Sequence, residues 1–292
     1  MTRPPDAVDV SRPDKELWPG ISKRAYVDYL LAVADDMVPW LGDRPLTLVR
    51  APDGVGGDRY FQKAAPTYAP PWIRTVRIAA PSARRDVDFV ICDHAQTLAW
   101  LGNQAAIEFH PAPVRADRLD RPDLFVVDVD PPEGGFEAGV EAVRLVLEVL
   151  ADVGLRPGLK TTGGKGLHVV VPIERRATTE ELRTAAARVT SIVAGRRPDL
   201  VTDEFRKDKR GGRVLLDPSR NAPGATLVAP YSPRAREEAT VSYPIVPEQL
   251  GRISPEEFTV ASVPGRLEDP GPVAWRALVR ARPQRLPAAL IA

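Results

Sequence analysis

Three aspartates at the ends of apolar segments are the first feature of the sequence that could do chemistry. Asp128 and Asp130 close the segment Leu-Phe-Val-Val-Asp-Val-Asp, and Asp217 closes Val-Leu-Leu-Asp. Side chains two apart on a strand leave the same face, so the first two carboxylates would lie about 6.5–7 Å apart. Burying carboxylates is costly unless a cation compensates them, and Mg²⁺ and Mn²⁺ prefer carboxylate oxygens. Two adjacent acids and one distant acid are what a two-metal phosphoryl-transfer site requires.

Two other interpretations of the Asp-x-Asp pair stay open. Asp130 could cap the next turn while Asp128 forms a salt bridge, with no metal involved. Phosphatases of the haloacid-dehalogenase type also begin with a strand and Asp-x-Asp, but a small or hydroxyl residue normally follows there. In this chain Pro131, Pro132 and Glu133 follow, which disfavours the phosphatase interpretation.

The glycine-rich segment Lys-Thr-Thr-Gly-Gly-Lys-Gly-Leu-His, residues 160–168, is a candidate phosphate-binding turn. Glycines let the backbone approach a ligand and present several N–H groups to it. It is not a Walker A loop, because Lys165 precedes Gly166 rather than Ser or Thr and the strand-like Val-Val-Val follows. A glycine-rich hairpin without a ligand is the alternative. The candidate phosphate contacts are Thr162, Gly163, Gly164, Lys165 and His168.

Periodicity and turn residues predict the elements that would position these groups. Helices are expected after an N-cap at Ser22 as far as Leu41, over 95–101, over 136–153, over 179–193 behind Thr178, and near 275–280. Strands are expected over 46–50, 59–63, 73–79, 87–91, 106–110, 123–130, 159–162, 167–173, 213–217 and 225–229. This order predicts an α/β or α+β fold in which helices flank a mixed sheet that carries the acids.

Composition sets the broad class. The 292 residues are 43% hydrophobic and 27% charged, with a net charge of +1, as in an ordinary globular protein. Cys92 is the single cysteine, which excludes an internal disulfide and a cysteine-based zinc site. No signal-like or membrane-spanning apolar segment occurs, so we expect a cytoplasmic, nucleoid-associated protein with no membrane contact. Phosphate binding remains open, because it needs local basic clusters such as residues 206–213 rather than a global surplus of charge.

Taken in order, the motifs resemble the polymerase domain of the bacterial non-homologous end-joining ligase LigD, in the archaeo-eukaryotic primase superfamily. The likeness runs from about Val10 to Leu250. The segments that carry it are His110-Pro111, residues 125–131, 161–168, 214–221 and 228–236.

The resemblance implies a primase-polymerase fold and a role for each matching residue. The resemblance implies that two divalent ions, Mn²⁺ or Mg²⁺, are bound by Asp128, Asp130 and Asp217. It implies that the incoming nucleotide is contacted by His110, Thr162, Gly163, Gly164, Lys165, His168 and Arg234. It implies that DNA is contacted by Lys15 and Lys23 at a 5′-phosphate, by Tyr60, Phe61 and Lys63 near the template, and by Arg210 in a mobile segment. An edge strand with an exposed aromatic is the alternative to base stacking by the Tyr60-Phe61 pair.

The activity implied is DNA-directed addition of ribo- or deoxynucleotides to 3′ ends, in break repair or gap filling. Expected partners are gapped or broken DNA with a 5′-phosphate, nucleoside triphosphates, Ku and a DNA ligase. We expect one monomeric polymerase domain over 1–292, with a core at about 10–250 and a Pro-rich extension at 251–292. No Lys-x-Asp-Gly ligase motif occurs in these residues, so we expect either an excised domain or a stand-alone relative. A primase that starts chains, or a DNA-end bridging module without catalysis, are the alternative functions.

Overall fold

The computed structural model describes residues 3–80 and 85–291. The chain divides into two compact units, each with its own sheet and core. Unit 1 comprises Met1–Asp117, Thr226–Ser242 and Glu256–Leu267. Unit 2 comprises Arg118–Ala225, Tyr243–Pro255 and Glu268–Ala292.

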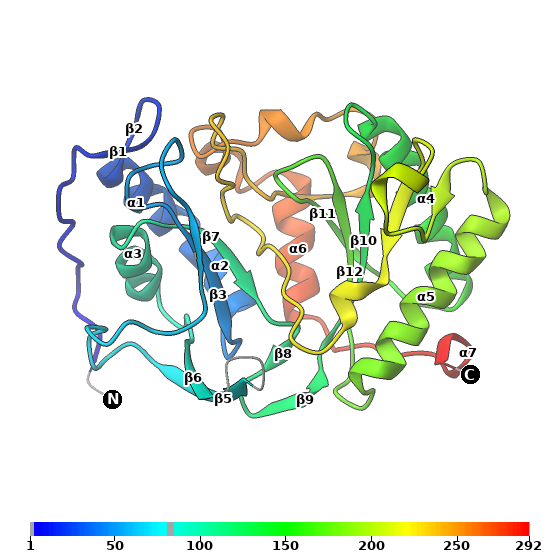
Figure 1. The fold of residues 1–292 in the computed structure, drawn as a ribbon, viewed down its shortest axis with the longest axis horizontal. Coiled ribbons are helices and arrows are strands. Elements are labelled where there is room, and N and C mark those ends of the chain that lie inside the picture. The colour runs from blue at the N-terminus through cyan, green and yellow to red at the C-terminus, as the bar shows by residue number, and fades with distance from the viewer. Residues whose placement is uncertain (1–2, 81–84, 292) are drawn as a thin grey trace. The chain divides into compact units, whose positions relative to one another are not determined.

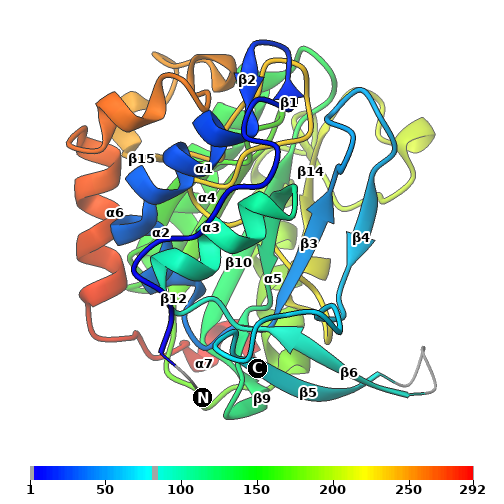
Figure 2. The same ribbon diagram turned by 90° about the vertical axis from the view of Figure 1, so that its left-hand side faces the viewer.

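Unit 1 contains a five-stranded antiparallel sheet in which β3 pairs with three neighbours. The sheet runs β4-β3-β6-β5, and β7 pairs with β3 along its length. Figure 2 shows β3 and β4 side by side, with β5 and β6 continuing from them. The strands of unit 1 are β1 (Glu16–Trp18), β2 (Ile21–Ser22), β3 (Leu46–Arg50), β4 (Tyr60–Gln62), β5 (Thr75–Ala80), β6 (Arg85–Val90), β7 (Ala106–Pro111) and β8 (Val114–Arg115).

Helices α1 (Lys23–Ala32), α2 (Ala34–Leu41) and α3 (Ala95–Asn103) complete the core of unit 1. The Ser22 hydroxyl accepts a hydrogen bond from the Ala25 N–H, so the predicted N-cap is confirmed. The prediction of one continuous helix to Leu41 is wrong, because the backbone leaves helical geometry at Val33 (ψ 2°). The hydrophobic spacing carries through this break, which is why the sequence pattern did not show it.

Unit 2 is built on a six-stranded sheet in the order β13-β14-β10-β12-β11-β15. Every pair is antiparallel except β13 with β14, so the sheet is mixed as predicted. The strands of unit 2 are β9 (Arg118–Pro122), β10 (Leu124–Asp130), β11 (Gly158–Thr161), β12 (Leu167–Pro172), β13 (Val201–Thr202), β14 (Val214–Asp217) and β15 (Pro244–Ile245). Strand β10, which carries the acid pair, therefore lies inside the sheet with a partner on each side.

Helices α4 (Phe136–Asp152) and α5 (Thr179–Arg196) pack on each other and on β10 (Figure 1). A capping box fixes the start of α5, since the Thr178 hydroxyl accepts from the Glu181 N–H and the Glu181 carboxylate accepts from the Thr178 N–H. Helix α6 (Pro270–Arg280) packs on β11 and β15, and α7 (Ala288–Ile291) packs on α5. The short 3₁₀ helices are Lys207–Lys209, Pro218–Asn221 and Pro247–Gln249 in unit 2, Val263–Arg266 in unit 1, and Pro255–Glu257, within which the chain passes from unit 2 to unit 1.

One predicted strand is wrong. Residues 225–229 form no strand, although Leu227 and Ala229 donate backbone hydrogen bonds to Pro111 and Phe109 of β7. The segment is extended and paired locally, but Pro230 follows it and the ladder does not continue. Across residues 3–80 and 85–291, no helix has the length and apolar character needed to cross a membrane.

Candidate active site

Four polar side chains form a row across the sheet of unit 2. Strand register places Lys160 opposite His168, His168 opposite Asp128, and Asp128 opposite Asp217. Neighbouring strands lie about 4.8 Å apart, so the row crosses four strands on one face of the sheet. All four side chains are buried. The three acids predicted from the sequence therefore belong to one structural site, with Asp130 two residues further along β10 on the same face as Asp128.

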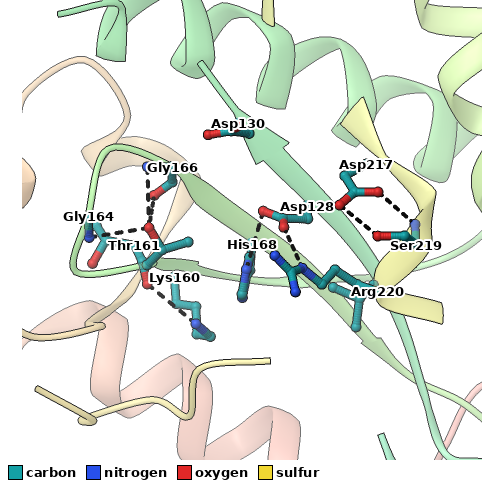
Figure 3. Close-up of polar contacts among 12 residues, drawn as sticks. Asp128, Asp130, Lys160, Thr161, Gly164, Gly166, His168, Asp217, Ser219 and Arg220 are labelled. Atoms are coloured by element: carbon teal, nitrogen blue, oxygen red, sulfur yellow. Dashed lines mark hydrogen bonds and ion pairs between the residues drawn. The ribbon is translucent and has the colours of Figure 1, made fainter. Parts of the chain in front are cut away.

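Asp128 is held between a histidine and an arginine (Figure 3). Its carboxylate lies 3.3 Å from Nε2 of His168 and accepts a 2.8 Å hydrogen bond from Nε of Arg220. Burial would raise the pKa of Asp128, but the contacts with His168 and Arg220 outweigh burial and lower it well below the usual value. Asp128 is therefore an anion at neutral pH.

His168 is a neutral partner of Asp128. Burial, and then the positive charge of Lys160, lower the pKa of His168 to about 4. A neutral ring that faces a carboxylate through Nε2 carries its proton on that nitrogen. Nδ1 is buried and has no hydrogen-bond partner within the described part of the chain. The ring thus orients Asp128, and donation from His168 to a phosphate stays a prediction.

The other two acids also have partners. Asp130 lies 3.4 Å from Nζ of Lys165 and accepts a 2.9 Å hydrogen bond from Nη1 of Arg210. Figure 3 shows the Asp217 carboxylate turned toward Ser219. The carboxylate accepts one hydrogen bond from the Ser219 N–H and one from the Ser219 hydroxyl, each 2.8 Å long. Among the residues that the structure describes, no three acidic, histidine or cysteine side chains come close enough to hold a metal as they stand.

The donor set nevertheless fits a hard divalent ion. Three carboxylates project from adjacent strands on one face, and two of them, Asp128 and Asp217, are directly opposite each other. Like charges in that position repel unless a cation compensates them. In the structure the compensating cations are the side chains of Lys165, Arg210 and Arg220. A divalent ion could take their place if the carboxylates rotated toward it.

Arg220 is the functional candidate that the sequence analysis missed. Burial lowers its pKa, but the charges of all three acids outweigh burial and raise it, with Asp128 contributing most. One guanidinium therefore lies close enough to interact with all three acids. Its position three residues after Asp217 was the available signal, but the contact depends on the 3₁₀ turn that follows β14.

The glycine turn lies against the acid-bearing strand. Gly163 adopts a positive φ of 66°, and a Cβ on Gly166 would lie 2.6 Å from the backbone oxygen of Val129, between the two acids of β10. The Thr162 hydroxyl donates to the Gly166 carbonyl and accepts from the Gly164 and Gly166 N–H groups. Within unit 2 the structure thus brings together the acids, the turn with Lys165, and Arg210.

Unit 1 holds the other predicted nucleotide contacts, His110 and Arg234, beside one carboxylate. Glu108 lies 2.8 Å from Nε2 of His110 and 3.1 Å from Nε of Arg234. Sequence analysis did not single out Glu108, although its place two residues before His110 puts both on one face of β7.

The predicted 5′-phosphate contacts lie close together in unit 1. Lys15 pairs with Asp53 at 2.8 Å, and Nζ of Lys23 donates to the Ser11 carbonyl at 2.7 Å. Burial, then the charges of Lys15 and Arg12, lower the pKa of Lys23. Three cations near one carboxylate form an electropositive cluster that an anion would stabilise.

The predicted template contacts lie on the edge strand β4 of the same unit. Phe61 is 74% exposed and Tyr60 44%, and Lys63, which follows the strand, is also exposed. The Phe61 ring lies 6.5 Å from the His110 ring, centroid to centroid. An exposed aromatic on an edge strand agrees with both interpretations of this pair, so base stacking stays a prediction.

Comparison with known proteins decides the family. The model for the LigD primase-polymerase domain matches residues 22–274. The chain belongs to this family. It is 34% identical to the multifunctional non-homologous end joining protein LigD of Pseudomonas aeruginosa over 288 residues, which cover 97% of the chain and 34% of that protein. It is 35% identical to the LigD of Mycobacterium tuberculosis over 256 residues, 81% of the chain and 32% of that protein.

The structural comparison agrees. The polymerase domain of M. tuberculosis Ligase D, solved in complex with DNA, matches with a TM-score of 0.86 at 31% identity, covering 95% of this chain and all of that one. The resemblance inferred from the motifs and the predicted mixed-sheet primase-polymerase fold are confirmed. The chain spans about a third of the length of these LigD proteins.

We expect the Gly166→Ala substitution to destabilise this LigD-type domain by about 1–3 kcal/mol, because the new Cβ would overlap the backbone of β10. Urea unfolding of the variant and the wild type measures the difference. Gly195→Ala is the matched control: the residue lies in α5, no atom lies within 4 Å of its added Cβ, and the change should be neutral or stabilising by up to about 1 kcal/mol. Equal stability of the two variants would mean that the turn does not pack closely against the backbone of β10.

Proposed function

We propose that this chain is a nucleotidyltransferase that adds nucleotides to DNA 3′ ends at gaps and breaks, directed by a template strand. The observation that carries the proposal is the row Lys160–His168–Asp128–Asp217, with a glycine turn against the same strand. Family membership supports a polymerase and does not favour the primase or the non-catalytic alternative.

Asp128, Asp130 and Asp217 would hold two divalent ions, Mg²⁺ or Mn²⁺. Bound there, the ions would lower the pKa of the attacking 3′-hydroxyl and stabilise charge on the leaving pyrophosphate. In the reaction the 3′-oxygen bonds to the α-phosphorus of the nucleotide, and the bond from that phosphorus to the β-phosphate oxygen breaks. His168 would remain a hydrogen-bond donor to Asp128 through its Nε2–H.

The remaining residues bind substrate. Lys165 and the N–H groups of Gly163 and Gly164 would contact the triphosphate, since cations and turned backbone amides both favour phosphate. In unit 1, His110 and Arg234 would contact the sugar and triphosphate. Thr162 and Arg210 already have partners in the structure, so each would exchange a hydrogen bond on substrate binding.

DNA is the proposed macromolecular substrate, as in the M. tuberculosis complex. Lys15 and Lys23 would bind a 5′-phosphate, and Tyr60 and Phe61 would stack on a template base. Because the named relatives are end-joining proteins, we place the chain in bacterial double-strand break repair or gap filling in the cytoplasm, with Ku and a DNA ligase as partners.

The Asp128→Asn substitution should reduce primer extension at least about a thousandfold, because it removes a charge from the metal site while keeping the side-chain shape. Extension of a labelled primer on a gapped duplex measures the loss, and binding to that duplex should stay within about twofold. Glu137→Gln removes an equal charge from the exposed start of α4 and should extend normally. Normal extension by Asp128→Asn would remove the two-metal assignment.

Lys15→Ala and Lys23→Ala should each weaken binding to a 5′-phosphorylated gap about 5–20-fold, and binding to the unphosphorylated gap much less. Fluorescence anisotropy at two salt concentrations measures both affinities, and each variant should show a slightly smaller salt dependence. Arg183→Ala, which removes a charge from the exposed face of α5 in unit 2, is the control. Variants that discriminate the two gaps as well as the wild type does would contradict this 5′-phosphate site.

Arg220→Gln should raise the affinity for Mn²⁺ by about fivefold or more, because a cation that compensates the three acids is removed. It should also lower the stability of the metal-free protein by about 1–2 kcal/mol, since the lost hydrogen bond to Asp128 is charge-assisted but partly exposed. Electron paramagnetic resonance of free Mn²⁺ measures the affinity. Arg196→Gln, on α5 and paired with Asp152, is the charge-matched control and should change neither quantity by as much. If Arg220→Gln binds Mn²⁺ no better than that control, the guanidinium does not compete with the metal.

A further inference from the structure

Glu108 is a buried carboxylate that lies between two residues of the proposed nucleotide site. It sits on β7, where His110 follows on the same face and Phe109 faces the opposite side and is fully buried. Only 7% of Glu108 is exposed. A carboxylate this deep must have partners that repay its lost hydration.

Both oxygens of Glu108 are used. Oε2 lies 2.8 Å from Nε2 of His110. Oε1 accepts from the Ala235 N–H at 3.0 Å and lies 3.1 Å from Nε of Arg234. The Arg234 backbone is fixed in turn, because its N–H donates to the Thr240 carbonyl at 2.7 Å. One side chain therefore links β7 to the segment that carries Arg234.

The charge of Glu108 determines what its partners can do. Burial raises its pKa, but the hydrogen bond with His110 and the charge of Arg234 outweigh burial and lower the pKa to about 2. The ionised carboxylate accepts hydrogen bonds and donates none. His110 must therefore carry a proton on Nε2, which leaves Nδ1 as the other ring nitrogen for contacts outside the pair.

We propose that Glu108 is a positioning residue that fixes the orientation of Arg234 and both the orientation and the protonation of His110 for contact with the sugar and triphosphate of the incoming nucleotide. The contact with a nucleotide rests on the proposed function; the arrangement within unit 1 does not. Phe61, whose ring neighbours that of His110, extends the same arrangement to the proposed template contact.

The substitution Glu108→Gln separates charge from shape. The amide oxygen can still accept from Ala235, but the amide nitrogen then faces His110 and donates to Nε2. His110 must move its proton to Nδ1, so the donor and acceptor atoms of the ring exchange. A role limited to packing would leave this proton in place.

The first measurement needs no nucleotide. The chain has only three histidines, so ¹⁵N-histidine labelling gives a simple NMR spectrum, and a His110→Gln variant identifies the His110 signals. We expect protonated Nε2 in the wild type and protonated Nδ1 in Glu108→Gln. Glu108→Asp keeps the anion and should keep the wild-type protonation. Unchanged protonation in folded Glu108→Gln would overturn the proposal.

The second measurement is kinetic. Glu108→Gln should raise KM for the nucleotide about tenfold while changing kcat less, because the loss concerns substrate contacts rather than metal ligands. Asp93→Asn is the matched control: Asp93 accepts from an arginine, Arg74, and a backbone N–H, that of Asp43, but contacts no predicted site residue. If KM rises no more in Glu108→Gln than in Asp93→Asn, Glu108 contributes to the fold but does not position the nucleotide contacts.

The two measurements distinguish failure of this inference from failure of the proposed function. If the wild type extends no primer, the polymerase assignment fails, and the NMR result still decides whether Glu108 sets the protonation of His110. If the wild type extends primers and either readout of Glu108→Gln matches the wild type, the inference alone fails. Thermal melting confirms that each variant is folded, and Glu108→Asp provides the kinetic test where Glu108→Gln is unfolded, with an expected KM increase smaller than tenfold.

Discussion

Asp128 and Asp217 face each other directly on adjacent buried strands, and the rest of unit 2 is arranged around this repulsion. Opposed side chains in a sheet lie about 5 Å apart, where two like charges cost stability unless a counter-charge is close. The chain supplies it with two cations: Arg220 bonds Asp128, and Lys160 lies at the other end of the row, beyond the neutral His168. The pair therefore places two like charges opposite each other in the sheet, a repulsion that a bound divalent cation, as proposed, would relieve.

The same solution occurs in each unit, where a buried carboxylate is paired with a histidine through Nε2. Asp128 pairs with His168 in unit 2, and Glu108 pairs with His110 in unit 1. In both cases an arginine forms an ion pair with the second carboxylate oxygen, and the acid is ionised despite its burial. The histidine is then a donor toward the acid and is held at one angle. Pairs of this kind preorganise a site, because the geometry is set before substrate arrives.

The sequence predicted local features well and pairings poorly. Strand β10 and its acids, the Ser22 cap and the Thr178 cap follow from spacing and residue type within a few positions. The strand register does not follow from the sequence in this way. Lys160, His168 and Asp128 form one row only because of which residues pair across three strands. Glu108 and Arg220 escaped notice for the same reason, since each is an ordinary charge until tertiary structure places it beside its partners. The helix break at Val33 was hidden because its apolar spacing continues through the break.

The salt bridge at Asp128 and a metal site at Asp128 began as competing interpretations, but the structure makes them compatible. Arg220, Arg210 and Lys165 together balance the three acids, so the folded chain is electrostatically satisfied by itself. A divalent ion carries twice the charge of a guanidinium and approaches carboxylate oxygens to about 2.1 Å, against 2.8 Å for the Arg220 contact. Its Coulomb attraction is therefore more than twofold greater, against which its own dehydration must be set. The salt bridges thus act as the counter-charge of the acids in the metal-free chain, and a divalent ion could exchange with them.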